Sequence, residues 1–349
     1  MVLRILLAPR LCVITAMALL SGCAFHADAS RPPAFQHTIS TDAKPWSHNR
    51  FDNGAEKFTF AIFSDLNGGE RERVFEIAVA QLSLLRPELI LSVGDLIDGD
   101  AEDRAELDAQ WNSFDARAAG SIAPVFHVGG NHDLTSLTMR DLWVQRYGRR
   151  YYHFIYRNVL FLVLDSEDYG EERMQEIYRA RAAALKVLDS DTPERAEEME
   201  YFRMPERMTG EIGTVQSEYF QAVIAQHRDV RWTLMFMHKP VWQRDDEPDF
   251  AAIEGALSDR PYTLFNGHLH SYSHVEKNGR DYITLGTTGG GQYGDMSFDH
   301  VTLVTMTDAG PSIANLKLEG ILDKTGHVPL AGDDLCFQVT KCPPGTAGE

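Results

Sequence analysis

Residues that can bind a metal ion or move a proton gather in five short segments of the chain. Each segment follows a short apolar run that predicts a β-strand, and the ligands of open α/β sheets collect at the carboxyl ends of strands. The five segments are therefore expected to converge on one site. They are Phe63-Ser64-Asp65-Leu66-Asn67-Gly68, Val93-Gly94-Asp95, Gly129-Gly130-Asn131-His132-Asp133, Phe236-Met237-His238-Lys239-Pro240 and Asn266-Gly267-His268-Leu269-His270.

Each segment by itself also has a purely structural interpretation. Asp95 after a glycine can belong to a turn or cap a helix, and His238 before Lys-Pro can end a strand. The five segments together are better explained by metal chemistry, because one carboxylate can bridge two cations. His268 and His270 place two imidazoles on one side of an extended backbone. Oxygen and imidazole ligands mixed in this way suit manganese, iron or zinc in a site without thiolates.

The elements that must position these segments form a layered domain. From Lys57 onward, short apolar runs alternate with helical patterns such as residues 71–85, which predicts an α/β architecture. Residues 171–207 have helical character and are long for a connection, which favours a lid over the site, with a solvated excursion as the alternative. Strands are expected at 58–63, 89–93, 125–128, 151–156, 159–164, 232–237, 262–265, 282–285 and 301–305.

Composition narrows the class of protein. The chain has 349 residues, of which 44% are hydrophobic and 24% charged, so it can bury a sizeable core. Lys and Arg number 33 against 51 Asp and Glu, which gives a net charge of −18. Because this charge repels the phosphate backbone of nucleic acid, no nucleic-acid partner is expected. Four cysteines are too few for a disulfide framework.

The first residues have the layout of an export signal. The apolar run 11–20 follows two arginines and is too short to span a bilayer. It ends in Leu20-Ser21-Gly22-Cys23, which resembles the lipobox of bacterial lipoproteins. The resemblance implies that residues 1–22 are removed and that Cys23 is acylated, whereas an ordinary secretory signal or an uncleaved anchor is the alternative. Ala24 resembles the pattern of lipoproteins sent to an outer membrane, which implies a lipid-anchored domain facing the periplasm.

Three further regions follow the signal. Residues 23–55 comprise Cys23 and a flexible tether without apolar periodicity, and residues 56–320 form the main domain. Residues 321–349 form a tail in which Cys336 and Cys342 are separated by five residues. In an oxidising compartment these cysteines are expected to form a disulfide, with two free thiols as the alternative.

The motifs, in their order and separation, strongly resemble those of the calcineurin-like metallophosphoesterases. The resemblance implies an α/β fold of four layers, a β-sandwich flanked by helices, with the metal site at the strand ends. It extends from about Phe58 to about Gly294 and rests on D-x-x at Asp65, GD at Asp95, GNHD at 130–133, His238, and GHxH at 267–270.

The same resemblance implies a role for each motif residue. Asp95 would bridge two divalent metal ions. His132 would contact the phosphate and protonate the leaving oxygen as a general acid, and Asp133 would fix the orientation of the His132 ring. The remaining ligands would be Asp65 and His270 for the first ion, and Asn131, His238 and His268 for the second.

Asn67 departs from the family pattern, because most members have a histidine there, as D-x-H. An amide oxygen is a weaker and harder ligand than imidazole, so the first ion is expected to be held loosely or to be Mn, Mg or Fe(II) rather than Zn. Of Mn, Fe and Zn, Mn is therefore favoured as the cofactor. Three outcomes stay open: Asn67 binds the metal through Oδ1, a water replaces it, or the site holds one ion only.

The expected activity is hydrolysis of a small phosphoric ester, either a monoester or a diester, by hydroxide activated at the two metals. The alternative is a binding protein that keeps the fold while Asn67 has impaired catalysis. The presence of the other ligands and of His132 favours the hydrolase.

Overall fold

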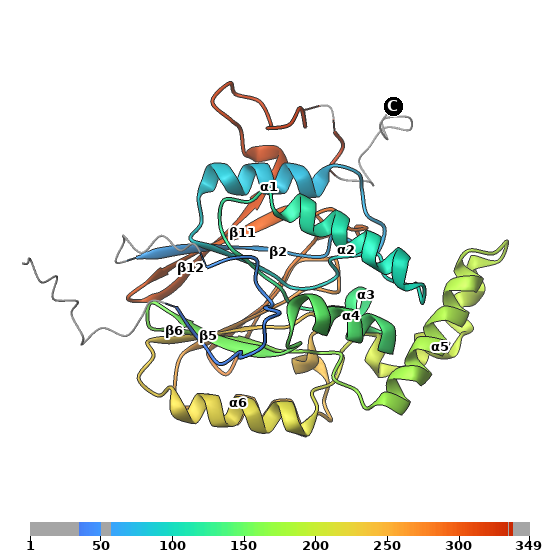
Figure 1. Ribbon diagram of the computed structural model, residues 1–349, viewed down its shortest axis with the longest axis horizontal. Helices are drawn as coiled ribbons and strands as arrows, with labels where there is room; N and C mark the ends of the chain where they lie inside the picture. Colours follow the sequence, from blue (N-terminus) through green and yellow to red (C-terminus); the bar gives the residue numbers. More distant parts are fainter. Residues whose placement is uncertain (1–34, 50–56, 334, 338–349) are drawn as a thin grey trace, which may run out of the picture. The chain divides into compact units, whose positions relative to one another are not determined.

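The computed structural model describes residues 35–49, 57–333 and 335–337. Within these residues two β-sheets pack face to face, and helices cover the outer face of each sheet (Figure 1). From α1 (Val74–Leu85) to α6 (Thr214–Gln226) the layers are helix, sheet, sheet and helix. The fold class expected from the sequence, an α/β sandwich flanked by helices, is confirmed.

The smaller sheet has five strands, of which the central ones carry functional loops. β2, β3 and β4 run parallel, whereas β11 and β12 join the sheet antiparallel. The carboxyl ends of the three parallel strands therefore meet at one edge. In spatial order the strands are β12 (Gly310–Lys317), β11 (His300–Thr307), β2 (Phe58–Phe63), β3 (Leu89–Ser92) and β4 (Val125–Phe126).

The larger sheet has seven strands. β6, β7, β8 and β10 run parallel, while β1, β5 and β9 pair antiparallel with their neighbours. In spatial order the strands are β1 (Phe35–His37), β5 (Tyr152–Tyr156), β6 (Val159–Val163), β7 (Trp232–Phe236), β8 (Tyr262–Asn266), β10 (Arg280–Thr284) and β9 (Ser273–Lys277).

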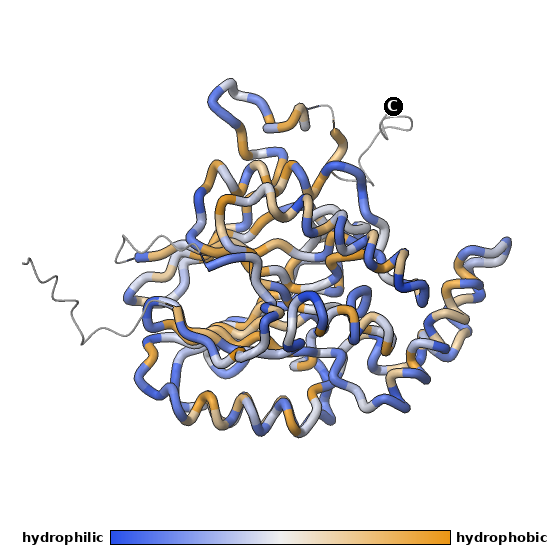
Figure 2. The backbone as a smooth tube through the Cα atoms, in the orientation of Figure 1, coloured by the Kyte–Doolittle hydropathy of each residue, from blue (hydrophilic) through white to orange (hydrophobic). Residues whose placement is uncertain are grey.

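Aromatic and aliphatic side chains fill the space between the sheets. Phe60 of the smaller sheet packs edge-on against Phe161 of the larger one, with ring centroids 5.4 Å apart. Phe161 in turn stacks on Phe154 and Phe236 within the larger sheet. Figure 2 shows the hydrophobic positions concentrated along the strands of both sheets. This core holds the two sheets in a fixed relation, and so it also fixes the loops at their ends.

Helices cover the outer faces of the two sheets, and some of them begin at side-chain caps. α1, α2 (Arg104–Ala118) and α4 (Leu137–Tyr147) pack on the smaller sheet, and α6 and α7 (Pro248–Ala256) pack on the larger one. Asp103 caps α2 by accepting from the backbone N–H of Glu106 at 2.9 Å. Ser136 caps α4 in the same way. The short helix α3 (Asn131–Leu134) stands directly after β4.

Residues 171–207, named the cap below, are helical. They form α5 (Glu171–Leu188) and the 3-10 helices η1 (Pro193–Glu198), η2 (Glu200–Arg203) and η3 (Pro205–Arg207). The cap has its own small apolar cluster, in which Met174 and Ile177 of α5 pack with Met204. In Figure 1 α5 projects away from the ends of the two sheets.

Each strand expected from an apolar run is present, with ends that differ by a few residues. β1, β9 and β12 were not expected. β9 and much of β12 are exposed, so they lack the apolar run that marks a buried strand. The helix expected over 71–85 begins only at Val74, because the backbone N–H of Arg71 donates to Gly289 and Arg73 has a left-handed φ of 67°.

The terminal predictions concern residues that the structure describes only in part. Residues 20–23, which resemble a lipobox, lie outside the described residues, as does Cys342. Cys336 is disulfide-bonded, and its pairing with Cys342 stays a prediction. None of the helices within 35–49, 57–333 and 335–337 has the length and apolar character needed to cross a membrane.

Candidate metal centre

The loops that follow β2, β3, β7 and β8 bring carboxylates and imidazoles together at one edge of the sandwich. The side chains fall into two groups of three, and in each group the ligand atoms lie within 4.8 Å of one another. Asp95 belongs to both groups, so its carboxylate could contact an ion in either one. The first group is Asp65, Asp95 and His270, and the second is Asp95, His238 and His268.

The first group lies in the interior of the edge. Asp65 is fully buried, and its Oδ1 lies 3.4 Å from Nε2 of His270. The same oxygen accepts from the backbone N–H of His268 at 3.0 Å. Asp65 follows β2 and His270 follows β8, so this group joins the two sheets.

The second group centres on His238. Its Nε2 lies 3.2 Å from Oδ2 of Asp95, 3.1 Å from Oδ1 of Asn131 and 3.2 Å from Nδ1 of His268. Asn131 is the first residue of α3, which places its amide oxygen next to the strand-end loops. The structure thus brings together Asp65, Asp95, Asn131, His238, His268 and His270.

Backbone carbonyl groups fix the orientation of the three imidazoles. Nδ1 of His238 donates to Val93 O at 2.8 Å, Nε2 of His268 donates to Arg207 O at 2.6 Å, and Nδ1 of His270 donates to Gly291 O. The protonated nitrogen of each ring thus faces outward, an assignment that rests on these acceptors. The other nitrogen of each ring points inward, and in the neutral ring its lone pair is available to a cation. Metal-binding histidines are held in this manner, so the residues present fit divalent cations.

Close packing of the loops depends on glycine at two positions. A Cβ on Gly94, where φ is +102°, would lie 2.5 Å from Nδ1 of His238. A Cβ on Gly130 would lie still closer to Oδ1 of Asp95. Any side chain at these positions would displace a candidate ligand, which explains the glycines in the GD and GNHD motifs.

Charges within the site shift the pKa of its members. Burial raises the pKa of Asp95, but His238 and His132 outweigh burial and hold it well below its usual range. Burial lowers the pKa of His238, but Asp95 outweighs it and raises that pKa to about 9. Burial and the nearby charge of His238 lower the pKa of His268 well below its usual range. The carboxylates therefore favour positive charge at their centre.

His132 stands beside this centre but is held differently from the expectation. Its Nδ1 lies 2.5 Å from the carbonyl oxygen of Asp98, to which it donates. Asp133 was expected to orient this ring. Instead, the oxygens of Asp133 accept from the backbone N–H groups of Gly130, Leu96 and Ile97. The role implied for Asp133 is thus corrected: it ties the loops after β3 and β4 together, because its carboxylate points into the protein.

Asn67 is buried, with 1% of its surface exposed. Its Nδ2 has no hydrogen-bond partner among the described residues. The Asn67 amide therefore lies in the interior near Asp65. This position does not decide whether Asn67 binds a metal ion or a water takes its place as the ligand. The three outcomes stated for Asn67 stay open.

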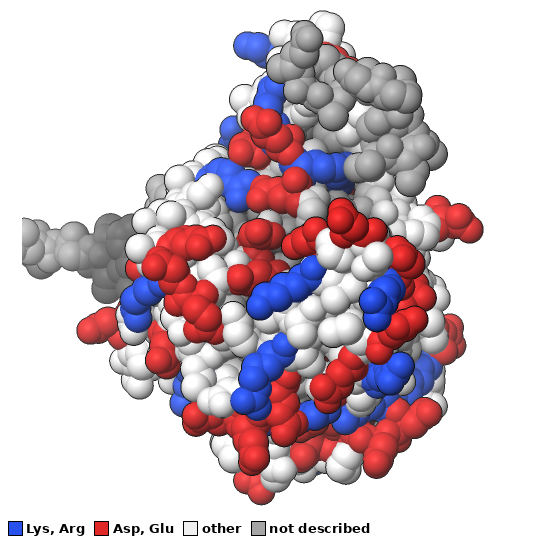
Figure 3. Space-filling model, turned by 90° about the vertical axis from the view of Figure 1, so that its right-hand side faces the viewer, with Lys and Arg blue, Asp and Glu red and all other residues white. Residues whose placement is uncertain are grey.

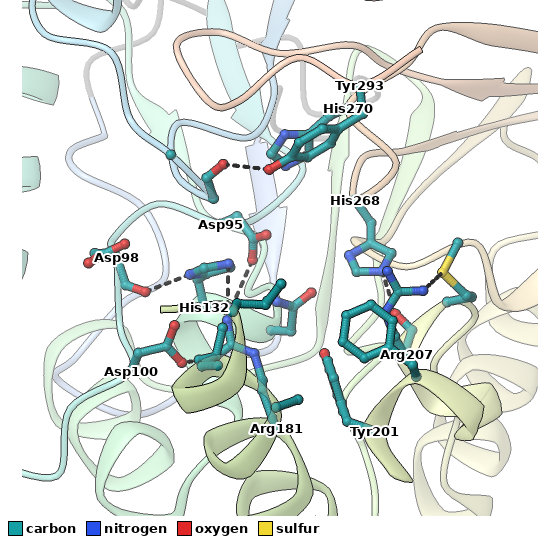
Figure 4. Close-up of a pocket in the computed structure, with 18 of the residues that line it drawn as sticks. Asp95, Asp98, Asp100, His132, Arg181, Tyr201, Arg207, His268, His270 and Tyr293 are labelled. Atoms are coloured by element: carbon teal, nitrogen blue, oxygen red, sulfur yellow. Dashed lines mark hydrogen bonds and ion pairs between the residues drawn. The ribbon is translucent and has the colours of Figure 1, made fainter. Parts of the chain in front are cut away.

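A cavity of about 700 Å³ opens in front of the site. Asp95, Asn131, His132, His268 and His270 line it from the strand ends, and the cap lines the opposite side. Figure 4 shows Arg181 and Tyr201 reaching from the cap toward the site, with Tyr293 beside His270. The rings of Tyr293 and His270 are stacked at 5.0 Å.

Arg181 is a functional candidate that sequence reasoning missed. Its side chain is 7% exposed, forms an ion pair with Asp100, and places Nη2 3.2 Å from Nε2 of His132. The sequence does contain a signal for it. Arg181 precedes Ala184, Leu185 and Leu188 by three, four and seven residues, so in a helix it shares the face of these apolar residues. The carbonyl groups of Asp98, Arg207 and Gly291 were also missed, because residue type carries no information about them.

The chain is similar to a known family and to several solved structures. No curated protein sequence matches the chain. Its fold is similar to that of a dimetal phosphatase from Danio rerio, with 16% identity and a TM-score of 0.48 over 74% of this chain and 98% of that one. It is also similar to a purple acid phosphatase from yellow lupin (Lupinus luteus) seeds, with 12% identity and a TM-score of 0.50 over 76% of this chain and 53% of that one. The family model described as calcineurin-like phosphoesterase matches residues 58–272, more than half of the chain, so the chain belongs to the calcineurin-like phosphoesterase family.

Proposed function

We propose that this protein is a metal-dependent hydrolase of small phosphoric esters that uses two divalent ions. The observation that carries the proposal is the arrangement of His238, His268 and His270. Each ring donates outward to a backbone carbonyl group and turns its free nitrogen toward Asp65, Asp95 or another ring. Inward lone pairs and carboxylates repel one another unless cations lie among them.

We propose the division of residues between the two ions that the resemblance implies. Asp65 and His270 would hold the first ion, and Asn131, His238 and His268 the second. Asp95 lies in both donor groups and would contact both ions. When bound, the ions would polarise the phosphoryl group and lower the pKa of a water so that it can attack phosphorus.

His132 is the proton donor of the proposal. Its Nδ1 is engaged by Asp98 O, so Nε2 is the atom that can give a proton to the leaving oxygen. In this structure Nε2 accepts from Nη2 of Arg181, because a guanidinium only donates. When Nη2 donates to a phosphoryl oxygen instead, Nε2 can carry the proton for the ester oxygen in the cavity. Carboxylate, amide and imidazole ligands suit manganese or iron, and we propose manganese first.

The substrate is proposed to be a small molecule rather than nucleic acid. Figure 3 shows acidic side chains spread over most of the face from which α5 projects, with basic side chains only interspersed. The net charge of the chain is −18. A polyanionic backbone would be repelled by such a surface, whereas a single phosphoester can enter the cavity.

We propose, further, that the protein is exported and anchored by lipid on Cys23, on the periplasmic side of an outer membrane. The support is the sequence pattern 20–23 after the apolar run 11–20. Incorporation of labelled palmitate by the protein, and its loss in Cys23→Ser, is the expected result. Export without labelling would replace the lipid anchor by an ordinary signal peptide.

Turnover is the direct test of the hydrolase. We expect detergent-solubilised protein, stripped with a chelator and then supplied with Mn²⁺, to hydrolyse an aryl phosphodiester or the matching monoester. The ratio of the two rates identifies the ester class. Absence of turnover with Mn²⁺, Fe²⁺, Zn²⁺ and Mg²⁺ alike would contradict the hydrolase and favour a binding protein with this fold.

A further inference from the structure

One face of α5 forms a wall of the cavity in front of the metal centre. Arg181, Ala184, Leu185 and Leu188 lie at intervals of three and four residues, so they share one side of the helix, and all line the cavity. The chain therefore turns a continuous helical face, rather than a loop tip, toward the site. A single cation begins this face, and apolar side chains continue it.

Other apolar side chains line the same cavity, and some of them are exposed. Tyr201 and Phe202 of η2 line the same cavity, and so does Met208. Leu188 and Met208 are each 42% exposed, and Tyr293 on the opposite side is 56% exposed. Large apolar groups left uncovered around one cavity next to polar groups are typical of a ligand site.

Arg181 lies at the end of this helical face that is next to the metal centre. Its guanidinium is nearly buried and is held by Asp100, and its Nη2 lies 3.2 Å from Nε2 of His132. A guanidinium donor at this place can bind an oxygen of the phosphoryl group. Figure 4 shows Arg181 and His132 pointing toward one another at the boundary between the strand-end loops and the cap.

These positions orient the ester in the cavity. In the proposed function, His132 gives its proton to the leaving oxygen, so the leaving group must continue from Nε2 into the space beyond it. On the cap side the cavity is lined by Leu185, Leu188 and the rings of Tyr201 and Phe202, and also by Asp189 and Arg207. The Arg207 guanidinium lies over the ring of Phe202, and Asp100 is paired with Arg181. Against Leu185, Leu188 and the ring of Phe202, the polar atoms of a sugar would find few partners.

We propose that the cap forms a leaving-group subsite that selects phosphoesters of apolar alcohols, alkyl or aromatic, with Arg181 binding a phosphoryl oxygen. This inference rests on the proposed function for the direction of the leaving group. It adds the substrate class, which the metal-binding motifs do not specify.

A series of leaving groups tests the subsite. Methyl, butyl, hexyl and benzyl phosphoesters have leaving groups of similar chemistry but different apolar area. We expect kcat/KM of the full-length, Mn-loaded protein to rise about two- to fourfold for each methylene that becomes buried. A flat series with measurable turnover would overturn the subsite and leave the hydrolase intact.

Substitutions at two positions of the cap and a matched control place the effect on the cap. In Leu185→Ser we expect a loss of kcat/KM that grows along the series and reaches about tenfold for the hexyl ester. In Leu84→Ser, the same change at an exposed leucine of α1, the series should be unaltered. Arg181→Met should lower kcat/KM for all esters, and Arg181→Lys should restore part of it. Equal behaviour of Leu185→Ser and Leu84→Ser would overturn the proposal.

Binding without reaction separates the two proposals. n-Alkylphosphonates carry the charged group and the chain but cannot be hydrolysed. Titration calorimetry on the Mn-loaded protein should give an affinity that rises with chain length and a heat-capacity change that becomes more negative. If this trend occurs without turnover of any ester, the result supports the subsite and contradicts the hydrolase. Phosphonate affinity that does not depend on chain length overturns the subsite.

Discussion

Nε2 of His268 donates to the backbone carbonyl oxygen of Arg207 at 2.6 Å, so the last residue of the cap fixes the ring of a candidate metal ligand. The preceding carbonyl oxygen, that of Glu206, accepts from Nζ of Lys239 at 2.8 Å. Lys239 follows His238 directly and forms a buried ion pair with Glu167 at 2.7 Å. The end of the cap is therefore attached to both strand-end loops that supply histidines from the larger sheet. Cap position and metal-site geometry are expected to change together.

The buried pair of Lys239 and Glu167 should be important for this attachment. Both side chains are about 1% exposed, so Lys239→Met leaves Glu167 buried without its cation. We expect a loss of about 3–5 kcal/mol in the free energy of unfolding, measured by urea denaturation. Adding Glu167→Gln should recover much of the loss, because the unpaired charge is then removed. A double variant as unstable as Lys239→Met would show that the lysine acts through its bond to the cap instead.

Metal content should depend on Asp95 more than on any other side chain. Because Asp95 belongs to both donor groups, Asp95→Ala removes a ligand from both ions. We expect metal analysis of this variant after dialysis to show nearly no bound manganese. His132→Ala, which alters no member of the two groups, should keep the full content. Two ions per chain in a folded Asp95→Ala protein would contradict the bridging position.

Loss of His132 should depend on the leaving group. In His132→Ala we expect kcat for an alkyl phosphoester to fall about 10²- to 10⁴-fold, because the leaving alkoxide then departs without a proton. An aryl ester with a good leaving group needs little protonation and should lose much less. His274→Ala, at a half-exposed histidine of β9, is the control and should leave both rates unchanged. Equal losses for the alkyl and aryl esters would remove the proton-donor role from His132.

His300 on β11 should make the fold sensitive to acid. It is buried among aromatic rings, neither ring nitrogen has a hydrogen-bond partner among the described residues, and burial lowers its pKa to about 3. Between its unfolded pKa of about 6.5 and this value the unfolded chain binds a proton that the folded chain does not. Stability is therefore complete above about pH 6.5 and is lost as the pH falls toward 3, by about 1.4 kcal/mol per pH unit from this group alone.

The corresponding measurement compares how steeply the free energy of unfolding changes with pH, not its absolute value. The free energy of unfolding of the metal-free protein is followed from pH 7.5 to pH 4.5 in the natural chain, His300→Phe and His300→Gln. Both replacements remove the titrating group, so below about pH 6.5 both should reduce the slope by about 1.4 kcal/mol per pH unit, whatever their packing cost at pH 7.5. An unchanged slope in both variants would show that His300 is protonated in the folded state.

The sequence by itself determined the candidate ligands and the strands that carry them. Asp65, Asp95, Asn131, His238, His268 and His270 stand after apolar runs, and all six meet at one edge because parallel strands end together. Such a prediction succeeds because strand periodicity and ligand chemistry are properties of residue type. The exposed strands β9 and β12 were missed for the same reason, since they lack an apolar run.

The tertiary structure decided what holds these ligands and what faces them. Asp98, not Asp133, orients His132, and carbonyl groups of Val93, Arg207 and Gly291 orient the other rings. Every residue has a carbonyl group, so only the path of the backbone shows which one accepts. The position of Arg181 beside His132 likewise depends on how α5 docks over the site, a contact across 49 residues of chain that no local pattern encodes.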